Sequence, residues 1–167
     1  YGVPVVLNQC GINVLGGRSR RLKLNYRTTE EIRYEAVKVL EGQNFDDMDG
    51  GSDSLQGYVS LMNGERPEVK QFDSKRDELE FLIDFLSDPP CDPEEICLVT
   101  RARWLYDKEY VPALEKAGIP FHILDGKETD HPGIRIATMH RVKGLEFACI
   151  IMAGATDDML PRGPKAE

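Results

Sequence analysis

The organisation of this chain follows from residues 138–147, which read Thr-Met-His-Arg-Val-Lys-Gly-Leu-Glu-Phe. Just before this stretch, residues 134–139 alternate two sets of side chains, and this period of two predicts a strand. At its end, the apolar run 147–154 predicts a second, buried strand. The polar segment between them, with Lys143 followed by Gly144, therefore predicts a loop on a rigid base. Functional residues are often found on such loops.

The rest of the chain alternates predicted strands with predicted helices. Thr28 and Ser74 are expected N-caps, and Gly118 is expected to end a third helix. This alternation predicts an α/β fold, with a mainly parallel sheet flanked by helices. The other predicted strands are residues 20–25, 95–100 and 119–124, with short candidates at 58–62 and 67–72. The predicted helices run from residue 28 to before Gly42, from residue 74 to before Pro89, and through Tyr110 to Gly118.

Length and composition describe one globular domain. A chain of 167 residues, 41% apolar and 30% charged, is long enough to bury a sizeable core. No apolar run approaches the ~20 residues of a membrane span, and residues 1–17 do not resemble a signal peptide. We therefore expect a cytoplasmic protein with no membrane partner, excised from a longer chain because it lacks an initiator methionine. The four cysteines have no zinc-binding spacing, so we expect reduced thiols and no metal site.

Charge is distributed unevenly along the chain. The net charge is −8, but residues 41–54 hold five acids and no base, and residues 73–95 hold nine acids and two bases. A local basic face can bind phosphate while the rest of the surface is acidic. For each base outside residues 22–32 and 138–147, ordinary solvated charge remains the alternative. The clustered bases are Arg18, Arg20, Arg21, Lys23, Arg27, Arg101, Arg103, Arg135, Arg141 and Lys143.

Two segments resemble motifs of one protein family. Residues 138–147 are similar to the fifth motif of the UvrD/Rep-like superfamily 1 DNA helicases, T-M/L-H-x-x-K-G-L-E-F. Residues 22–32 are similar to the fourth motif, L-x-x-N-Y-R-S/T-x-x-x-I. Residues 96–101 and 117–121 also resemble family strands. The resemblance covers most of the chain, and it is specific at the first two segments and loose elsewhere.

The resemblance implies a RecA-like, P-loop NTPase-type second motor domain. Residues 1–167 would form this single domain, with an irregular segment at 1–17 and a long loop at 42–66. Only about ten residues separate the G-I-P strand from the fifth motif, so the accessory domain of many relatives would be absent. The sixth motif does not occur before Glu167, so the domain would be incomplete at its C-terminus.

The resemblance also implies residue roles in an ATP-dependent DNA helicase. ATP with Mg would be held mainly by the first motor domain of the same polypeptide, and single-stranded DNA would be the substrate. Arg27, at a strand-to-helix turn suited to anions, would be catalytic and would neutralise the γ-phosphate. Gly144 and Glu146 would lie at the nucleotide. The residues expected to contact DNA are Thr138, His140 and Lys143.

Other functions remain open. Arg27 is also readily explained as a solvated arginine ahead of a helix. The main rival is a helicase-like DNA-binding or protein-docking module without ATPase activity. A G-x-x-x-x-G-K-[ST] sequence upstream in the gene would favour the motor. A small-molecule enzyme on a doubly wound sheet is a third alternative, but no general base and nucleophile pair supports it.

Overall fold

The computed structural model describes residues 24–38, 45–46, 52–53, 59–126 and 131–156. The chain divides into two compact units, Tyr1–Val69 and Lys70–Glu167, and each is described by itself. The single domain expected for residues 1–167 therefore stays a prediction. The irregular segment expected at 1–17 lies outside the described residues.

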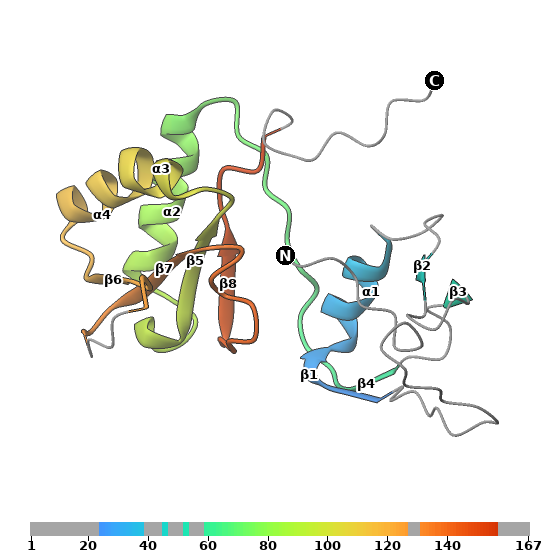
Figure 1. The fold of residues 1–167 in the computed structure, drawn as a ribbon. Coiled ribbons are helices and arrows are strands. Elements are labelled where there is room, and N and C mark those ends of the chain that lie inside the picture. The colour runs from blue at the N-terminus through green and yellow to red at the C-terminus, as the bar shows by residue number, and fades with distance from the viewer. Residues whose placement is uncertain (1–23, 39–44, 47–51, 54–58, 127–130, 157–167) are drawn as a thin grey trace, which may run out of the picture. The chain divides into compact units, whose positions relative to one another are not determined.

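A four-stranded parallel sheet forms the centre of the second unit (Figure 1). Its order is β6-β7-β5-β8, and β5 pairs in parallel with a neighbour on each side, as Leu98 pairs with Ile136 and with Ile151. All five residues of β5 are buried. The predicted α/β class with a mainly parallel sheet is therefore confirmed. The strands are β5 (Ile96–Thr100), β6 (Phe121–Ile123), β7 (Ile134–Thr138) and β8 (Cys149–Met152).

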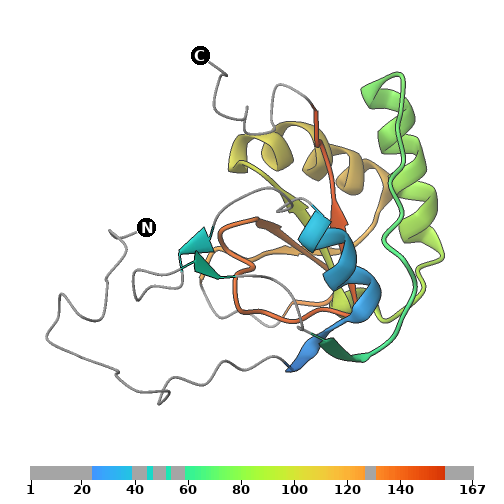
Figure 2. The same ribbon diagram turned by 90° about the vertical axis from the view of Figure 1, so that its right-hand side faces the viewer.

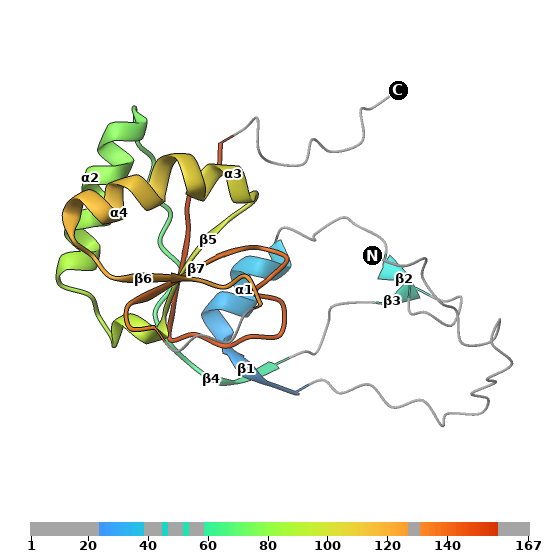
Figure 3. The same cartoon turned by 60° about the vertical axis from the view of Figure 1, so that its left-hand side comes forward.

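Helices cover one face of this sheet (Figure 3). Helix α2 (Lys75–Ser87) begins at the predicted cap, where Ser74 Oγ accepts a hydrogen bond from Asp77 N at 3.2 Å. The short turn η2 (Pro93–Glu95) leads into β5. No helix in the described ranges is long and apolar enough to cross a membrane. The buried core under the helices consists of Leu82, Leu86, Ile96, Leu98, Leu105, Tyr106, Tyr110, Leu114, Ile134 and Ile136.

The predicted helix through Tyr110 has a break in its hydrogen bonding. It consists of α3 (Arg103–Leu105), the π-turn η3 (Tyr106–Tyr110) and α4 (Val111–Ala117). In the π-turn, Val111 N donates to Tyr106 O, which lies five residues back. Pro112 follows and has no N–H to continue an α-helical ladder. Gly118 ends α4 with a φ of 68°, as predicted.

Among the described residues of the second unit, the other face of the sheet is covered by the β7–β8 loop. Cys97, Val99 and Ala137 form a second buried cluster, and Val142 and Phe147 of the β7–β8 loop pack against it. The strand predicted within 147–154 is confirmed as β8, but the prediction that it is buried on both faces is wrong. Strand β8 is an edge strand, and Ile150 and Met152 are 52% and 63% exposed. Only its alternate residues Cys149 and Ile151 pack against the core under the helices.

The first unit is built around a short parallel strand pair and one helix. Strand β1 (Leu24–Thr29) pairs with β4 (Val59–Met62), which confirms the short strand predicted at 58–62, and α1 (Glu30–Lys38) follows β1. Strands β2 (Phe45–Asp46) and β3 (Ser52–Asp53) pair antiparallel within the segment 42–66 that the sequence predicts as a loop. The strand predicted at 67–72 is wrong, because this segment forms no strand and Val69 is 96% exposed.

Candidate functional site

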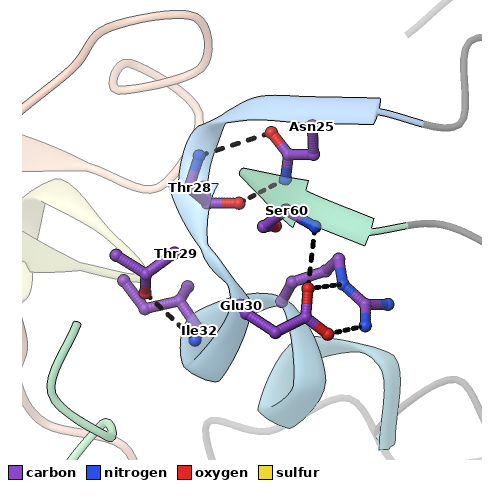
Figure 4. A network of polar contacts seen from close by, with 7 residues as sticks. Asn25, Thr28, Thr29, Glu30, Ile32 and Ser60 are labelled. Atoms are coloured by element: carbon purple, nitrogen blue, oxygen red, sulfur yellow. Dashed lines mark hydrogen bonds and ion pairs between the residues drawn. The ribbon is translucent and has the colours of Figure 1, made fainter. Parts of the chain in front are cut away.

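Arg27 lies in an irregular part of β1. Asn25 pairs with Ser60 and Thr29 pairs with Met62, so β1 holds two more residues than β4 over this interval. The Asn25 side chain bridges the irregularity, since its Oδ1 accepts from Arg27 N at 2.9 Å. The same Oδ1 also accepts from Thr28 N at 3.3 Å (Figure 4). Bulges of this kind redirect side chains and are common beside functional sites. Asn25 therefore fixes the backbone at the exposed Arg27.

The positioning role of Asn25 was missing from the sequence interpretation. The signal for it was present, because an asparagine two residues before a turn residue is typical of an Asx turn. The expected cap at Thr28 is wrong for the same reason. Asn25 Nδ2 donates to Thr28 Oγ1, and β1 continues one residue further. Thr29 Oγ1 instead accepts from Ile32 N at 3.4 Å.

Two carboxylates already occupy the N-terminus of α1. Glu30 accepts from Ser60 N at 2.7 Å and pairs with Arg33, and Glu31 accepts from Gly64 N at 2.8 Å. The Arg33 guanidinium, with the Ser60 amide, lowers the pKa of Glu30 to about 2. These negative charges at the helix N-terminus would repel a phosphate there. Any phosphate recognition in this region therefore depends on the Arg27 side chain itself.

An open hollow of about 210 Å³ lies on the first unit. It does not include Arg27, and three of its five lining residues are glutamates. Carboxylates facing a hollow disfavour phosphate ligands, so this hollow is not a nucleotide site. The lining residues are Glu30, Glu31, Tyr34, Glu35 and Arg66.

The loop after β7 forms a tight turn on the sheet. Met139 N donates to Thr100 O at 3.0 Å, which continues the pairing between β7 and β5 by one step. Thr138 O then accepts from Arg141 N at 2.8 Å and from Val142 N at 3.3 Å. This turn brings Val142 onto the buried cluster of the second sheet face. The beginning of the loop is thus fixed by both hydrogen bonds and apolar packing.

The structure brings five predicted site residues together in this loop. Thr138 is half-buried at the end of β7, while His140, Lys143 and Glu146 are exposed. Gly144 has a φ of 86° with open space where a Cβ would stand, so backbone conformation rather than crowding requires glycine here. The sixth predicted residue, Arg27, belongs to the other unit.

The loop lies at a topological switch point. The connection from β5 to β6 runs through α3, η3 and α4 over one face, whereas the connection from β7 to β8 runs over the other face (Figure 2). In open α/β sheets, ligands bind outside the carboxyl ends of strands whose connections diverge in this way. Residues that follow Thr100 and Thr138 therefore occupy the preferred position for a ligand.

Arg141 links two of these strand ends. Its Nε donates to Leu124 O at 3.3 Å, just beyond β6. A Cβ built on Gly126 would lie 2.0 Å from Arg141 Nη2, so the guanidinium occupies the space that this glycine leaves. The sequence alone predicts no role for Gly126. The position of Gly126 just after a predicted strand was the only feature of the sequence that could have indicated a role for it.

A polar network secures the carboxyl end of β8. Glu78 Oε1 accepts from Tyr110 Oη at 2.7 Å and from Gly154 N at 2.9 Å, and Lys75 Nζ donates to Glu78 Oε2. Burial raises the pKa of Glu78, but these hydrogen bonds outweigh it and the pKa lies below its usual value. A Cβ on Gly154 would meet Leu105 Cδ2 at 2.7 Å. The network joins α2, η3 and β8, so its role is structural.

Three cysteines are described, and all are free thiols. Burial raises the pKa of Cys97 to about 12, and burial also raises those of Cys91 and Cys149. Raised pKa values make thiols poor nucleophiles at neutral pH. Among the described residues, no group of three His, Cys, Asp or Glu side chains could hold a metal ion.

Comparison of this chain with protein-family models, with curated proteins and with solved structures finds no match.

Proposed function

We propose that this chain is the second RecA-like motor domain of an ATP-dependent DNA helicase or translocase of the UvrD/Rep-like type. It contributes Arg27, Gly144 and Glu146 to an ATP site shared with a first motor domain of the same polypeptide. It contributes Thr138, His140 and Lys143 to the contact with single-stranded DNA. ATP binds with Mg, held mainly by the first motor domain.

One observation carries this proposal: the five residues expected in one loop lie together at the carboxyl end of a parallel strand. The loop starts at Thr138, and its polar residues are exposed at the switch point of the sheet. The sheet fixes the backbone of this loop, and its polar side chains face outward. Such a loop can couple the binding of ATP to the binding of single-stranded DNA. The parallel α/β architecture is compatible with a RecA-like domain.

Arg27 supplies the chemical part of the proposal. Phosphoryl transfer is catalysed by positioning and by stabilising charge on the phosphate oxygens. An arginine offers a planar fork of donors that matches these oxygens. The Asn25 hydrogen bonds fix the backbone from which this side chain extends.

The proposal is tested on the intact polypeptide and on this chain alone. The chain alone contains no G-x-x-x-x-G-K-[ST] sequence, so a phosphate-release assay should show no turnover. In the intact protein, Glu146→Gln should raise KM for ATP about tenfold, as expected for loss of a charged hydrogen bond. Glu115→Gln, an exposed glutamate of α4, is the matched control.

Two results would contradict the motor assignment. One is an intact polypeptide that lacks DNA-stimulated ATP hydrolysis, which would favour the DNA-binding or docking module. The other is an equal KM for ATP in the Glu146→Gln and Glu115→Gln proteins, which would remove the nucleotide from this loop.

A further inference from the structure

The only tryptophan of the chain lies on the surface just beyond β5. Trp104 is the second residue of α3 and is 48% exposed, whereas its neighbour Leu105 is 5% exposed and belongs to the core. A single exposed apolar side chain is ordinary on a protein surface. The residues around Trp104 therefore decide whether it has a role.

Two arginines, Arg101 and Arg103, precede this tryptophan within the same short segment. Arg103 Nε bonds to Asp107 Oδ2 at 3.2 Å, which holds its guanidinium along the helix. Arg101 is exposed and makes no hydrogen bond or ion pair to any described residue. An exposed indole three positions after an exposed arginine that has no partner among the described residues suits a ligand with both an aromatic ring and a phosphate.

The segment after β5 is a direct neighbour of the predicted DNA-contacting loop. Thr100 pairs with Thr138, and Thr100 O accepts the hydrogen bond from Met139 N. Arg101 and Met139 therefore leave the sheet side by side, and His140 follows at once. A strand of nucleic acid that contacts the loop after β7 needs to extend by only about 5 Å, one strand spacing, to reach the segment after β5.

Local charge at this edge favours a polyanion despite the acidic chain. The carboxylates that act on Arg103 are those of Asp107 and Asp125. Arg101 and Arg141 add two further positive charges at the adjoining strand ends, so arginines outnumber these carboxylates. The net charge of −8 resides largely elsewhere, including the acidic helix α2.

We propose that Trp104 is a base-stacking platform and Arg101 a phosphate contact for single-stranded nucleic acid. This inference rests on the proposed function, because it extends the DNA contact of Thr138, His140 and Lys143 onto the segment after β5. Stacking on an indole tolerates every base, and an arginine contact to phosphate tolerates every sequence. The combined site therefore binds single strands without sequence preference, as a translocating enzyme requires.

The experiment uses the whole 167-residue chain and short oligothymidylate. Trp104 is the only tryptophan, so its emission reports directly on this site, while the anisotropy of a labelled oligonucleotide reports on binding anywhere. Oligonucleotide should quench Trp104 emission with the same midpoint as the anisotropy change. Trp104→Ala should weaken binding about five- to tenfold, and Trp104→Phe should weaken it less.

Matched controls separate the aromatic and charge contributions. Phe81 is 39% exposed on α2, and Phe81→Ala should leave affinity unchanged. Arg101→Gln should reduce the slope of log affinity against log salt by about 0.7, the value for one phosphate contact on a single strand. Arg76→Gln removes the same charge from α2, where Arg76 pairs with Glu80, and should leave the slope unchanged.

The possible failures are distinguishable. Anisotropy that reports binding while Trp104 emission and the Trp104→Ala affinity stay unchanged would overturn this inference and leave the proposed function standing. A chain that binds no oligonucleotide at low salt would overturn both. Unaltered thermal melts of the variants show that lost binding does not come from lost folding.

Discussion

The two predicted site segments are held in place by different forces. The turn at Arg27 depends on polar contacts, because Asn25 supplies its hydrogen bonds and α1 has no buried residue among those described. The loop after β7 stands on a buried strand, and Val142 and Phe147 anchor it on an apolar cluster. Segments with few buried apolar contacts open at low free-energy cost. The Arg27 turn, fixed by the Asn25 hydrogen bonds rather than by apolar packing, should therefore open at a lower free-energy cost than the loop.

The variant expected to have the largest effect is Arg27→Ala, and the quantity that it changes is kcat. In the intact protein, Arg27→Ala should lower kcat for DNA-stimulated ATP hydrolysis by roughly 10³–10⁵, the range for arginines that stabilise phosphoryl transfer. Arg27→Lys should restore little, because a point charge cannot replace the planar fork. Asn25→Ala should lower kcat less, because it loosens the turn but leaves the guanidinium.

The control for the Arg27→Ala variant is a measurement of its folding. Arg27 is exposed, so its replacement should leave the thermal melt unchanged. A near-normal kcat for Arg27→Ala with an unchanged melt would show that Arg27 is an ordinary solvated residue.

The next effect concerns the stability of the second unit. Glu78→Ala removes the acceptor for Tyr110 and Gly154 and the ionic partner of Lys75. The free energy of unfolding should fall by about 1.5–3 kcal/mol, because buried donors lose a charged partner. Urea unfolding followed by Trp104 emission measures it.

A second glutamate on the same helix provides the comparison. Glu80 is 63% exposed and pairs with Arg76 alone among the described residues, so Glu80→Ala should cost less than about 0.5 kcal/mol. Equal losses for the two variants would show that the Glu78 network adds nothing to stability.

The smallest effect is the pH dependence of the two regions. The pKa values of Glu30 and Glu78 both lie below the usual 4.5. Each carboxylate therefore stabilises the folded state fully above about pH 4.5, and this contribution is lost as the pH falls through the folded pKa. For Glu30 the loss extends down to about pH 2.

Two backbone amides report these titrations separately. Ser60 N donates to Glu30 and Gly154 N donates to Glu78, so protonation of each carboxyl group should move the corresponding amide proton shift. The Ser60 midpoint should lie near pH 2 and the Gly154 midpoint below 4.5. A midpoint at or above 4.5 for either amide would mean that its hydrogen bond is weak in solution.

Periodic and capping signals predicted much of the second unit. Strands β5, β6 and β7, the cap at Ser74 and the stop at Gly118 follow from local patterns, which determine local backbone structure. The exposed face of β8 could not be predicted this way. A run such as Cys-Ile-Ile-Met looks the same in a central strand and in an edge strand, and strand order depends on distant contacts.

The site was predicted as a set of residues rather than as an arrangement. Grouping of Thr138 to Glu146 followed from their adjacency in one loop. The Asn25 bridge, the Arg141 contact with Leu124 and the closeness of Arg101 to Met139 depend on backbone geometry and on strand pairing. Such contacts join residues that the sequence alone does not bring together.

The position of β5 in the middle of the sheet affects how this protein is made. This strand is wholly buried in the folded unit, yet its partner β8 is synthesised about 50 residues later. At roughly 5–20 residues per second, a ribosome takes on the order of 3–10 s to complete that partner. During this interval an apolar strand has emerged without its second neighbour. Until β8 is synthesised, we therefore expect the apolar side chains of β5 to be exposed to association with other apolar surfaces.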